Sequence, residues 1–141
     1  MAEKKQIQVR LVTPDRILLD VMADAVEVPS KAGYFEAIHG HAPVLAQLWP
    51  GEVKVHGATG EGAGQRFLVA RGFAEVLPER VTILAEVATT PDKVNHTAAE
   101  GLKQHGEELW QQAGDDASKY DAALESIAEA EMLLGSHAQH E

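Results

Sequence analysis

Two histidines, two residues apart, are the side chains of this sequence best spaced to do chemistry. His39 and His41 follow Gly33, and on an extended strand such a pair projects to one face and can share a divalent metal ion. A complete site would need a carboxylate about four residues further on, where residues 44–46 are all apolar. It would also need a second histidine motif, which His56 alone does not supply.

The spacing resembles the opening of the cupin metal-binding motif, so a cupin-like enzyme using His39 and His41 is one alternative. Other catalytic patterns are missing. The sequence has no Gly-x-Ser-x-Gly elbow, no Gly-Lys-Ser/Thr phosphate loop and no cysteine. Its glycine-rich run, 57–64, precedes a predicted strand rather than a helix, which favours a flexible hairpin loop. We therefore expect no catalytic, cofactor or metal site, and a protein that is not an enzyme.

The charge of the chain is unevenly distributed. The net charge is -10, and residues 1–88 carry nine basic and eleven acidic side chains. Residues 89–141 carry three basic and eleven acidic ones, and no arginine follows Arg80. Nucleic acid phosphates and anionic lipids would repel such a tail, so we expect protein partners, no nucleic acid and no lipid insertion.

Length and composition indicate a soluble globular protein. At 141 residues with 45% hydrophobic residues, the chain suits one domain, or a small domain with an appendage. No run approaches the roughly 18 apolar residues that a membrane span needs. The polar start, residues 1–6, is unlike a signal peptide, so we expect an unprocessed N-terminus. The absence of cysteine fits a reducing cytoplasm.

The elements that must position any site fall into two regions. Residues 1–88 alternate apolar and polar side chains between frequent turns, the pattern of half-buried strands. We predict an antiparallel β-sandwich of about ten short strands. The candidate strands are 7–11, 16–21, 25–29, 34–38, 44–48, 52–56, 65–70, 73–77 and 81–85.

Residues 89–141 change to helical periodicity and predict a second domain, an antiparallel two-helix hairpin. The first helix should begin at Thr90-Pro91-Asp92, with a capping hydroxyl and a proline in the first turn. Residues 114–116 should end it and cap the second, which should stop before Gly135. The predicted apolar stripes are Val94, Ala98, Leu102, Leu109 and Ala113, and Tyr120, Leu124, Ile127, Ala130 and Leu134. The fold class is thus α+β, mainly β.

The hairpin should be marginally stable. Gly101 and Gly106 lie inside its first helix, where each costs about 1 kcal/mol relative to alanine. Two interpretations follow: a passive appendage, or a loosely docked element whose movement regulates. Trp110 is expected to pack against the core or the other helix.

The segment Gly33 to Gly51, with its Gly-His-Ala-Pro at 40–43 and Pro-Gly at 50–51, resembles one family strongly. That family is the epsilon subunit of F-type ATP synthases, called delta in mitochondria. Residues 72–76 and 81–86, and the opening at 12–16, are similar to the same family at the usual spacing. Over the helices the resemblance depends on length and architecture.

The resemblance implies a non-catalytic central-stalk rotor subunit, coupling proton flow to ATP synthesis. Its sandwich would bind the gamma subunit and the c-ring, with the alpha and beta catalytic subunits as further candidate partners. It would sit peripherally at the cytoplasmic face of the bacterial inner membrane, within the ATP synthase complex. Carried over by position, the c-ring contacts would be Tyr34, Glu36, His39, His41 and Pro43.

Two departures from the family pattern matter. The family usually has a carboxylate at the position of Tyr34 and a glycine at that of Glu36, so an acidic contact has moved by two residues. Because strand residues alternate, Tyr34 and Glu36 should still share a face. Some members bind ATP or modulate its hydrolysis through basic residues of the hairpin, whereas here Glu129 and Glu131 replace them. A free-standing protein adaptor is the remaining alternative.

Overall fold

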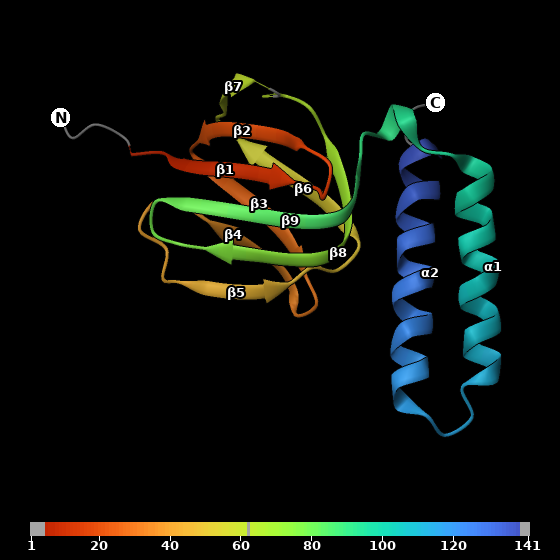
Figure 1. Ribbon diagram of the computed structural model, residues 1–141. Coiled ribbons are helices and arrows are strands. Elements are labelled where there is room, and N and C mark those ends of the chain that lie inside the picture. The colour runs from red at the N-terminus through yellow and green to blue at the C-terminus, as the bar shows by residue number, and fades with distance from the viewer. Residues whose placement is uncertain (1–4, 62, 139–141) are drawn as a thin grey trace. The chain divides into compact units, whose positions relative to one another are not determined.

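The computed structural model describes residues 5–61 and 63–138 (Figure 1). The chain divides into two compact units, Met1–Ala88 and Thr89–Glu141, and each is described by itself. Most of the polar N-terminal stretch (residues 1–4) and Gly62 of the glycine-rich run lie outside the described residues.

Among the described residues, the first unit contains nine strands, and the second contains a 3-10 turn and two helices. The strands are β1 (Ile7–Val12), β2 (Ile17–Ala23), β3 (Ala25–Ser30), β4 (Gly33–Ala37), β5 (Val44–Gln47), β6 (Gly51–His56), β7 (Thr59–Glu61), β8 (Phe67–Val76) and β9 (Arg80–Thr89). The helical elements are η1 (Pro91–Lys93), α1 (His96–Gln112) and α2 (Ala117–Ala138). The predicted class, a mainly β sandwich followed by a helical hairpin, is confirmed.

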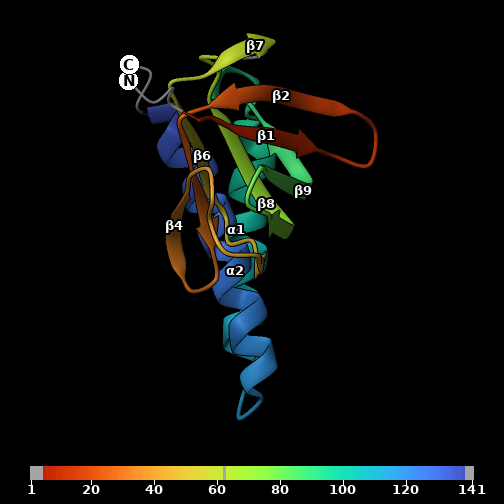
Figure 2. The ribbon, with the colours of Figure 1, turned by 90° about the vertical axis from the view of Figure 1, so that its left-hand side faces the viewer.

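The strands form two layers joined through β6. The hydrogen-bonded order is β4-β3-β6-β8-β9-β1-β2-β7, and β5 pairs with β8. The first half of β6 pairs with β8 and its second half with β3, so the sheet folds over at this strand. Figure 2 shows β4 and β6 in one layer and β1, β2, β8 and β9 in the other.

Large aliphatic side chains fill the space between the layers. In β1 and most of β9 alternate residues are buried, whereas β3, apart from Glu27, and the first four residues of β8 are buried continuously. The largest fully buried side chains are Ile7, Leu11, Leu48, Leu68, Ile83, Val9, Val26, Val28, Val53, Val69, Val76 and Val81. This burial removes the apolar face of each layer from water, which is the main driving force for the sandwich.

Three expectations for the strands were wrong. β1 pairs with β9 in parallel, because strands from opposite ends of a unit share no hairpin that fixes their direction. The predicted strands 65–70 and 73–77 are one strand, β8, in which Arg71 has φ 58° and Gly72 has φ 155°. The predicted loop 57–64 contains β7, which pairs with β2.

The strand β8 needs glycine at its irregular point. A Cβ built on Gly72 would lie 1.8 Å from the carbonyl oxygen of Leu84 on β9. The carbonyl of Gly72 also accepts a hydrogen bond from the backbone N–H of Leu48 at 2.9 Å. The Arg-Gly pair thus kinks a continuous strand rather than ending it, which is the role of a β-bulge.

The helix ends also differ from the prediction. Thr90-Pro91-Asp92 begins only the 3-10 turn η1, and the Thr90 side chain makes no capping hydrogen bond. The α-helix starts after Asn95, whose side-chain oxygen accepts from the N–H of Ala98 at 2.9 Å. α2 continues through Gly135 to Ala138, because a glycine weakens a helix without forcing it to stop.

Most of the buried residues of the helices are small, and two of them, Ala113 and Ala130, belong to the predicted stripes. Ala99, Gly106, Ala113, Ala123 and Ala130 are buried, whereas Ala98 and Leu124 are exposed. A Cβ on Gly106 would lie 2.7 Å from Cγ1 of Ile127, so this glycine permits the contact.

Larger side chains flank this contact. Trp110 and Tyr120 meet edge to face with ring centroids 4.7 Å apart, which confirms the expected interhelix role of Trp110. Glu129, which stands where some members of the family carry a basic residue, is buried.

Candidate functional site

The turn between β4 and β5 has a fixed shape. Gly40 adopts φ 89°, a conformation that favours glycine, and its N–H donates to the carbonyl of Pro78 at 2.7 Å. The N–H of His41 donates to the carbonyl of Ile38 at 3.1 Å. The turn is therefore anchored to the β8–β9 hairpin and presents its side chains in defined directions.

Tyr34 and Glu36 lie on the outer face of β4, as their spacing predicts. The Tyr34 hydroxyl accepts a hydrogen bond from the N–H of Glu52 at 2.8 Å, so the ring reaches across to β6. The ammonium of Lys54 lies over this ring, 5.4 Å from its centroid. Half of Tyr34 remains exposed to solvent.

The other predicted contact residues point elsewhere. His39 lies in the turn and lines a hollow at the start of β1 together with Gln8 and Arg80. The Nδ1 atom of His41 is 2.6 Å from the carbonyl oxygen of Ala42, and its ring centroid is 6.4 Å from that of Phe35. Pro43 is exposed just before β5. The five predicted residues therefore lie on β4 and in the turn that leads from it to β5.

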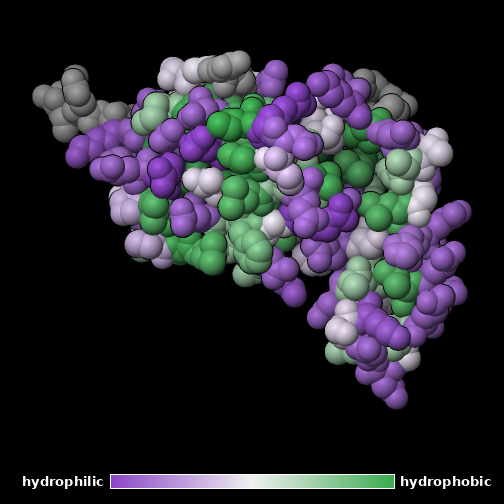
Figure 3. Space-filling model, viewed as in Figure 1, coloured by the Kyte–Doolittle hydropathy of each residue, from purple (hydrophilic) through white to green (hydrophobic). Residues whose placement is uncertain are grey.

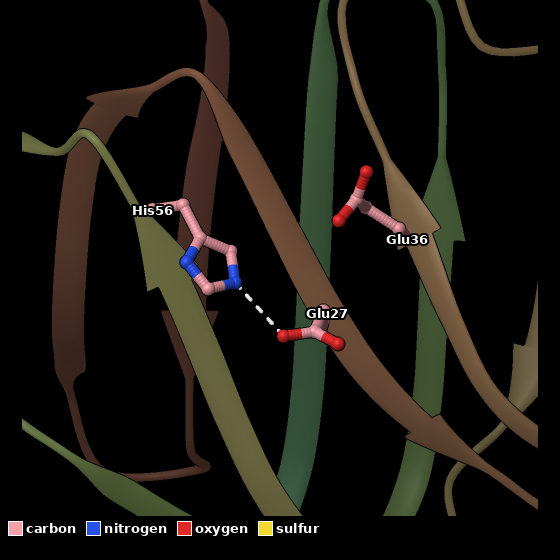
Figure 4. A group of neighbouring side chains, drawn as sticks. All are labelled: Glu27, Glu36 and His56. Atoms are coloured by element: carbon pink, nitrogen blue, oxygen red, sulfur yellow. Dashed lines mark hydrogen bonds and ion pairs between the residues drawn. The ribbon is translucent and has the colours of Figure 1, made fainter.

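The structure does not place His39 and His41 on a strand, so the geometry required by the cupin-like alternative is absent. Within residues 5–61 and 63–138, the group of side chains able to hold a metal is instead Glu27, Glu36 and His56. Figure 4 shows these three on the adjacent strands β3, β4 and β6. Glu27 was not among the residues predicted from the sequence, because only the strand register brings it between Glu36 and His56.

An ion pair fixes the neighbouring part of β6. Nε of Arg66 donates to Oε1 of Glu52 at 2.5 Å, and Nη2 donates to Oε2 at 3.2 Å. This hydrogen bond, with the charge of Glu52, raises the pKa of Arg66 above its ordinary value. The two-pronged pairing links the start of β6 to the segment that enters β8.

The outer face of the other layer exposes apolar side chains. Leu45, Phe73 and Leu84, on β5, β8 and β9, have exposed fractions of 71%, 50% and 50%. On one side, Phe73 lies opposite Gln47 of β5. On the other side, the backbone hydrogen bonds between Leu77 and Arg80 set the register of the β8–β9 hairpin, in which Phe73 falls opposite Leu84. Figure 3 shows green, hydrophobic side chains among polar ones on this face. Exposed aromatic and aliphatic residues on a rigid sheet suit contact with a protein.

These features define a class: a rigid β-sandwich that offers contact surfaces, joined to an α-helical hairpin. The chain belongs to the ATP synthase delta/epsilon chain family, whose β-sandwich domain matches residues 6–91. The resemblance inferred from the Gly-His-Ala-Pro segment is thereby confirmed.

The similarity to relatives extends over the helices. An ATP synthase epsilon chain from Paramagnetospirillum magneticum is 38% identical to this chain. The alignment covers 92% of this chain and 96% of the relative. One from Koribacter versatilis is 37% identical over 75% of this chain and 72% of its own. These relatives are named as epsilon chains, which agrees with the expectation of a non-catalytic subunit.

Two solved structures share the fold. A chain in the mitochondrial ATP synthase of Euglena gracilis superimposes with a TM-score of 0.69 at 20% identity, covering 96% of this chain and 84% of that one. A chain in the central stalk and c-ring structure of Tetrahymena thermophila mitochondrial ATP synthase gives 0.54 at 17% identity, covering 67% and 73%.

Proposed function

We propose that this chain is a non-catalytic rotor subunit of the central stalk of an F-type ATP synthase, joining the gamma subunit to the c-ring. The observation that carries the proposal is the family match across the whole sandwich, together with a relative that aligns over nearly the full chain. The solved chains that share its fold belong to mitochondrial ATP synthase structures that contain the c-ring and, in one case, the central stalk. The family match and the solved structures both support a position in the complex where the chain binds gamma and the c-ring at once.

The apolar face formed by Leu45, Phe73 and Leu84 is the surface for gamma. Its exposed aliphatic and aromatic groups would gain free energy when a partner removes them from water, at roughly 25 cal/mol per Å² buried. The sandwich carries nearly balanced charge, so electrostatic repulsion does not oppose this contact.

The strand β4 and the turn that leads from it to β5 form the surface for the c-ring. Tyr34 and Glu36 offer an aromatic ring and a carboxylate from one face of β4, and His41 and Pro43 extend the contact from the anchored turn. Polar and aromatic side chains of this kind suit the polar loops of a membrane ring.

The proposed location is peripheral, at the cytoplasmic face of the bacterial inner membrane. Across the described ranges, neither helix has the length and apolar character needed to cross a bilayer. Attachment would therefore come through the c-ring. The acidic hairpin offers few groups that could bind a nucleotide triphosphate or acidic catalytic subunits, so ATP sensing is not part of this proposal.

A pull-down with purified gamma subunit tests the proposal. The double variant Phe73→Ser with Leu84→Ser should lose gamma, while Ile38→Ser, with the same exposed fraction of 50%, should retain it. If the double variant held gamma as well as the parent protein, the assigned face would be wrong. If the parent protein recovered neither gamma nor the c-ring from membranes, a free-standing adaptor would replace the rotor subunit.

A second arm of the same experiment concerns the ring. Replacing Glu36 by Gln together with His41 by Ala should weaken assembly with the c-ring and uncouple ATP-driven proton pumping. Unchanged pumping in membranes carrying this variant would refute the placement of β4 against the ring.

A further inference from the structure

We propose that Glu27, Glu36 and His56 form a binding site for one divalent transition-metal ion of the zinc type on the outer face of β3, β4 and β6. Their potential ligand atoms all lie within 4.8 Å of one another, and each comes from a different strand (Figure 4). The site is separate from the apolar face assigned to gamma.

Strand register brings the three side chains together. Glu27 on β3 lies directly opposite Glu36 on β4, and on its other side it lies opposite Lys54 of β6. His56 lies opposite Ala25, two residues along β3 from Glu27. Because the alanine side chain is small, the imidazole can lean along the sheet, and its Nε2 reaches Oε2 of Glu27 at 2.8 Å.

The charges in this group are incompletely balanced by the protein. Two carboxylates directly opposite each other on paired strands repel. His56 contacts Glu27, but Glu36 has no hydrogen-bond or ion-pair partner among the residues that the structure describes. The nearest cation along the register, Lys54, lies over the Tyr34 ring. A bound cation between Glu27 and Glu36 would turn this repulsion into attraction to a shared centre.

The donor set selects the kind of metal. One imidazole nitrogen with two carboxylate oxygens suits zinc, which commonly takes three protein ligands and leaves its fourth position to water. Alkaline earth ions prefer oxygen alone. Binding would replace the proton that Nε2 of His56 shares with Glu27, and the two ligand atoms would move apart to accommodate the ion.

Occupancy would also stabilise an edge of the sandwich. β4 ends the strand order, and within the described part of the chain β3 is its one neighbour in that order. A metal bound by β4, β3 and β6 would link this edge strand to two others. A ligand that binds the folded state alone raises its stability with ligand concentration.

Calorimetric titration of the metal-free full chain with zinc chloride tests the site. We expect one zinc ion bound per chain, and a melting temperature that rises with zinc concentration. His56→Gln and Glu27→Gln should each weaken binding roughly tenfold or more, while His105→Gln, which removes an exposed histidine of α1, should leave it unchanged. The ring signals of His56 in the nuclear magnetic resonance spectrum should shift as the first ion binds.

Three results would overturn the proposal: zinc affinity in His56→Gln equal to that of the parent, a site abolished by His39→Gln or His41→Gln instead, or no zinc binding by the parent protein. Circular dichroism spectra matching the parent confirm that the variants are folded. The isolated chain is used, so a negative result would leave the assignment to the ATP synthase stalk standing, and failure of gamma binding would leave the metal site standing.

Discussion

The carboxylate of Asp116 caps α2 and gives the clearest pH prediction at the scale of single residues. Its Oδ1 accepts from the Ser118 hydroxyl at 2.6 Å and from the Ser118 N–H at 3.0 Å. The hydroxyl hydrogen bond is the largest cause that lowers the pKa of Asp116 below its ordinary value. A lowered pKa in the folded state means that this contribution to stability is present above the unfolded pKa and is lost as pH falls through the folded one.

Ser118→Ala should therefore raise the pKa of Asp116 toward its ordinary value. The titration of its carboxyl carbon, followed by nuclear magnetic resonance, measures the change. Ser126→Ala, on the same helix but distant from the cap, is the control. An Asp116 titration that Ser118→Ala leaves unaltered would show that the hydroxyl does not hold the charge.

Gly106 and Gly101 look alike in the sequence but should respond oppositely to alanine. A Cβ on Gly106 would meet Ile127 at 2.7 Å, so Gly106→Ala should destabilise the hairpin by about 1–3 kcal/mol through overpacking. Apart from its chain neighbours and the nearby helix backbone, no described atom lies within 4 Å of a Cβ on Gly101, so Gly101→Ala should stabilise α1 by about 1 kcal/mol. Chemical denaturation followed through the helical circular dichroism signal measures both. Equal effects of the two variants would contradict the packing.

Several residues of the site could not be found from the sequence. Glu27, Glu36 and His56 are up to 29 positions apart, and only the pairing of three strands places them together. On an extended strand, the spacing of His39 and His41 would place both side chains on one face, which is why it predicts a metal pair. The structure has a turn at these residues instead. By contrast, the shared face of Tyr34 and Glu36 followed from alternation, since both lie within one strand.

At the scale of elements, two residues are candidates for the cap at the start of α1: Thr90, predicted from the sequence, and Asn95, found in the structure. The side-chain oxygen of Asn95 accepts a hydrogen bond from the N–H of Ala98. The buried hydroxyl of Thr90, by contrast, has no hydrogen-bond partner among the described residues. Asn95→Ala should reduce the free energy of unfolding of the hairpin by about 1 kcal/mol, and Thr90→Ala should change it much less. Denaturation of the two variants in parallel measures the difference. A larger loss for Thr90→Ala would restore the helix start predicted from the sequence.

Element types were more predictable than their ends and partners. The period of apolar residues gave strands before residue 88 and helices after it, because burial of one face imposes that period. The predicted strands 65–70 and 73–77 left a gap at Arg71-Gly72, since local sequence does not tell a bulge within β8 from a break between strands. The parallel pairing of β1 with β9 depends on contacts between the ends of the unit, which no local pattern encodes.

At the scale of the whole molecule, the two units have cores of different quality. The sandwich buries large aliphatic side chains from most of its strands, whereas the buried helix residues are mainly alanine and glycine. Because stabilisation grows with the apolar area removed from water, the hairpin should open locally more often than the sandwich. The eleven acidic and three basic side chains of residues 89–141 add repulsion to this difference.

Native-state hydrogen exchange should therefore divide the chain at the same boundary. Amides within α1 and α2 should exchange faster than those of β1, β8 and β9, and added salt should narrow the gap by screening the acidic charges. Gly101→Ala should slow exchange in the hairpin and leave the strands unchanged, which separates helix stability from global unfolding. Equal protection of helices and strands would rule out the mobile hairpin and support the passive appendage, because a regulatory movement requires an opening that the sandwich does not share.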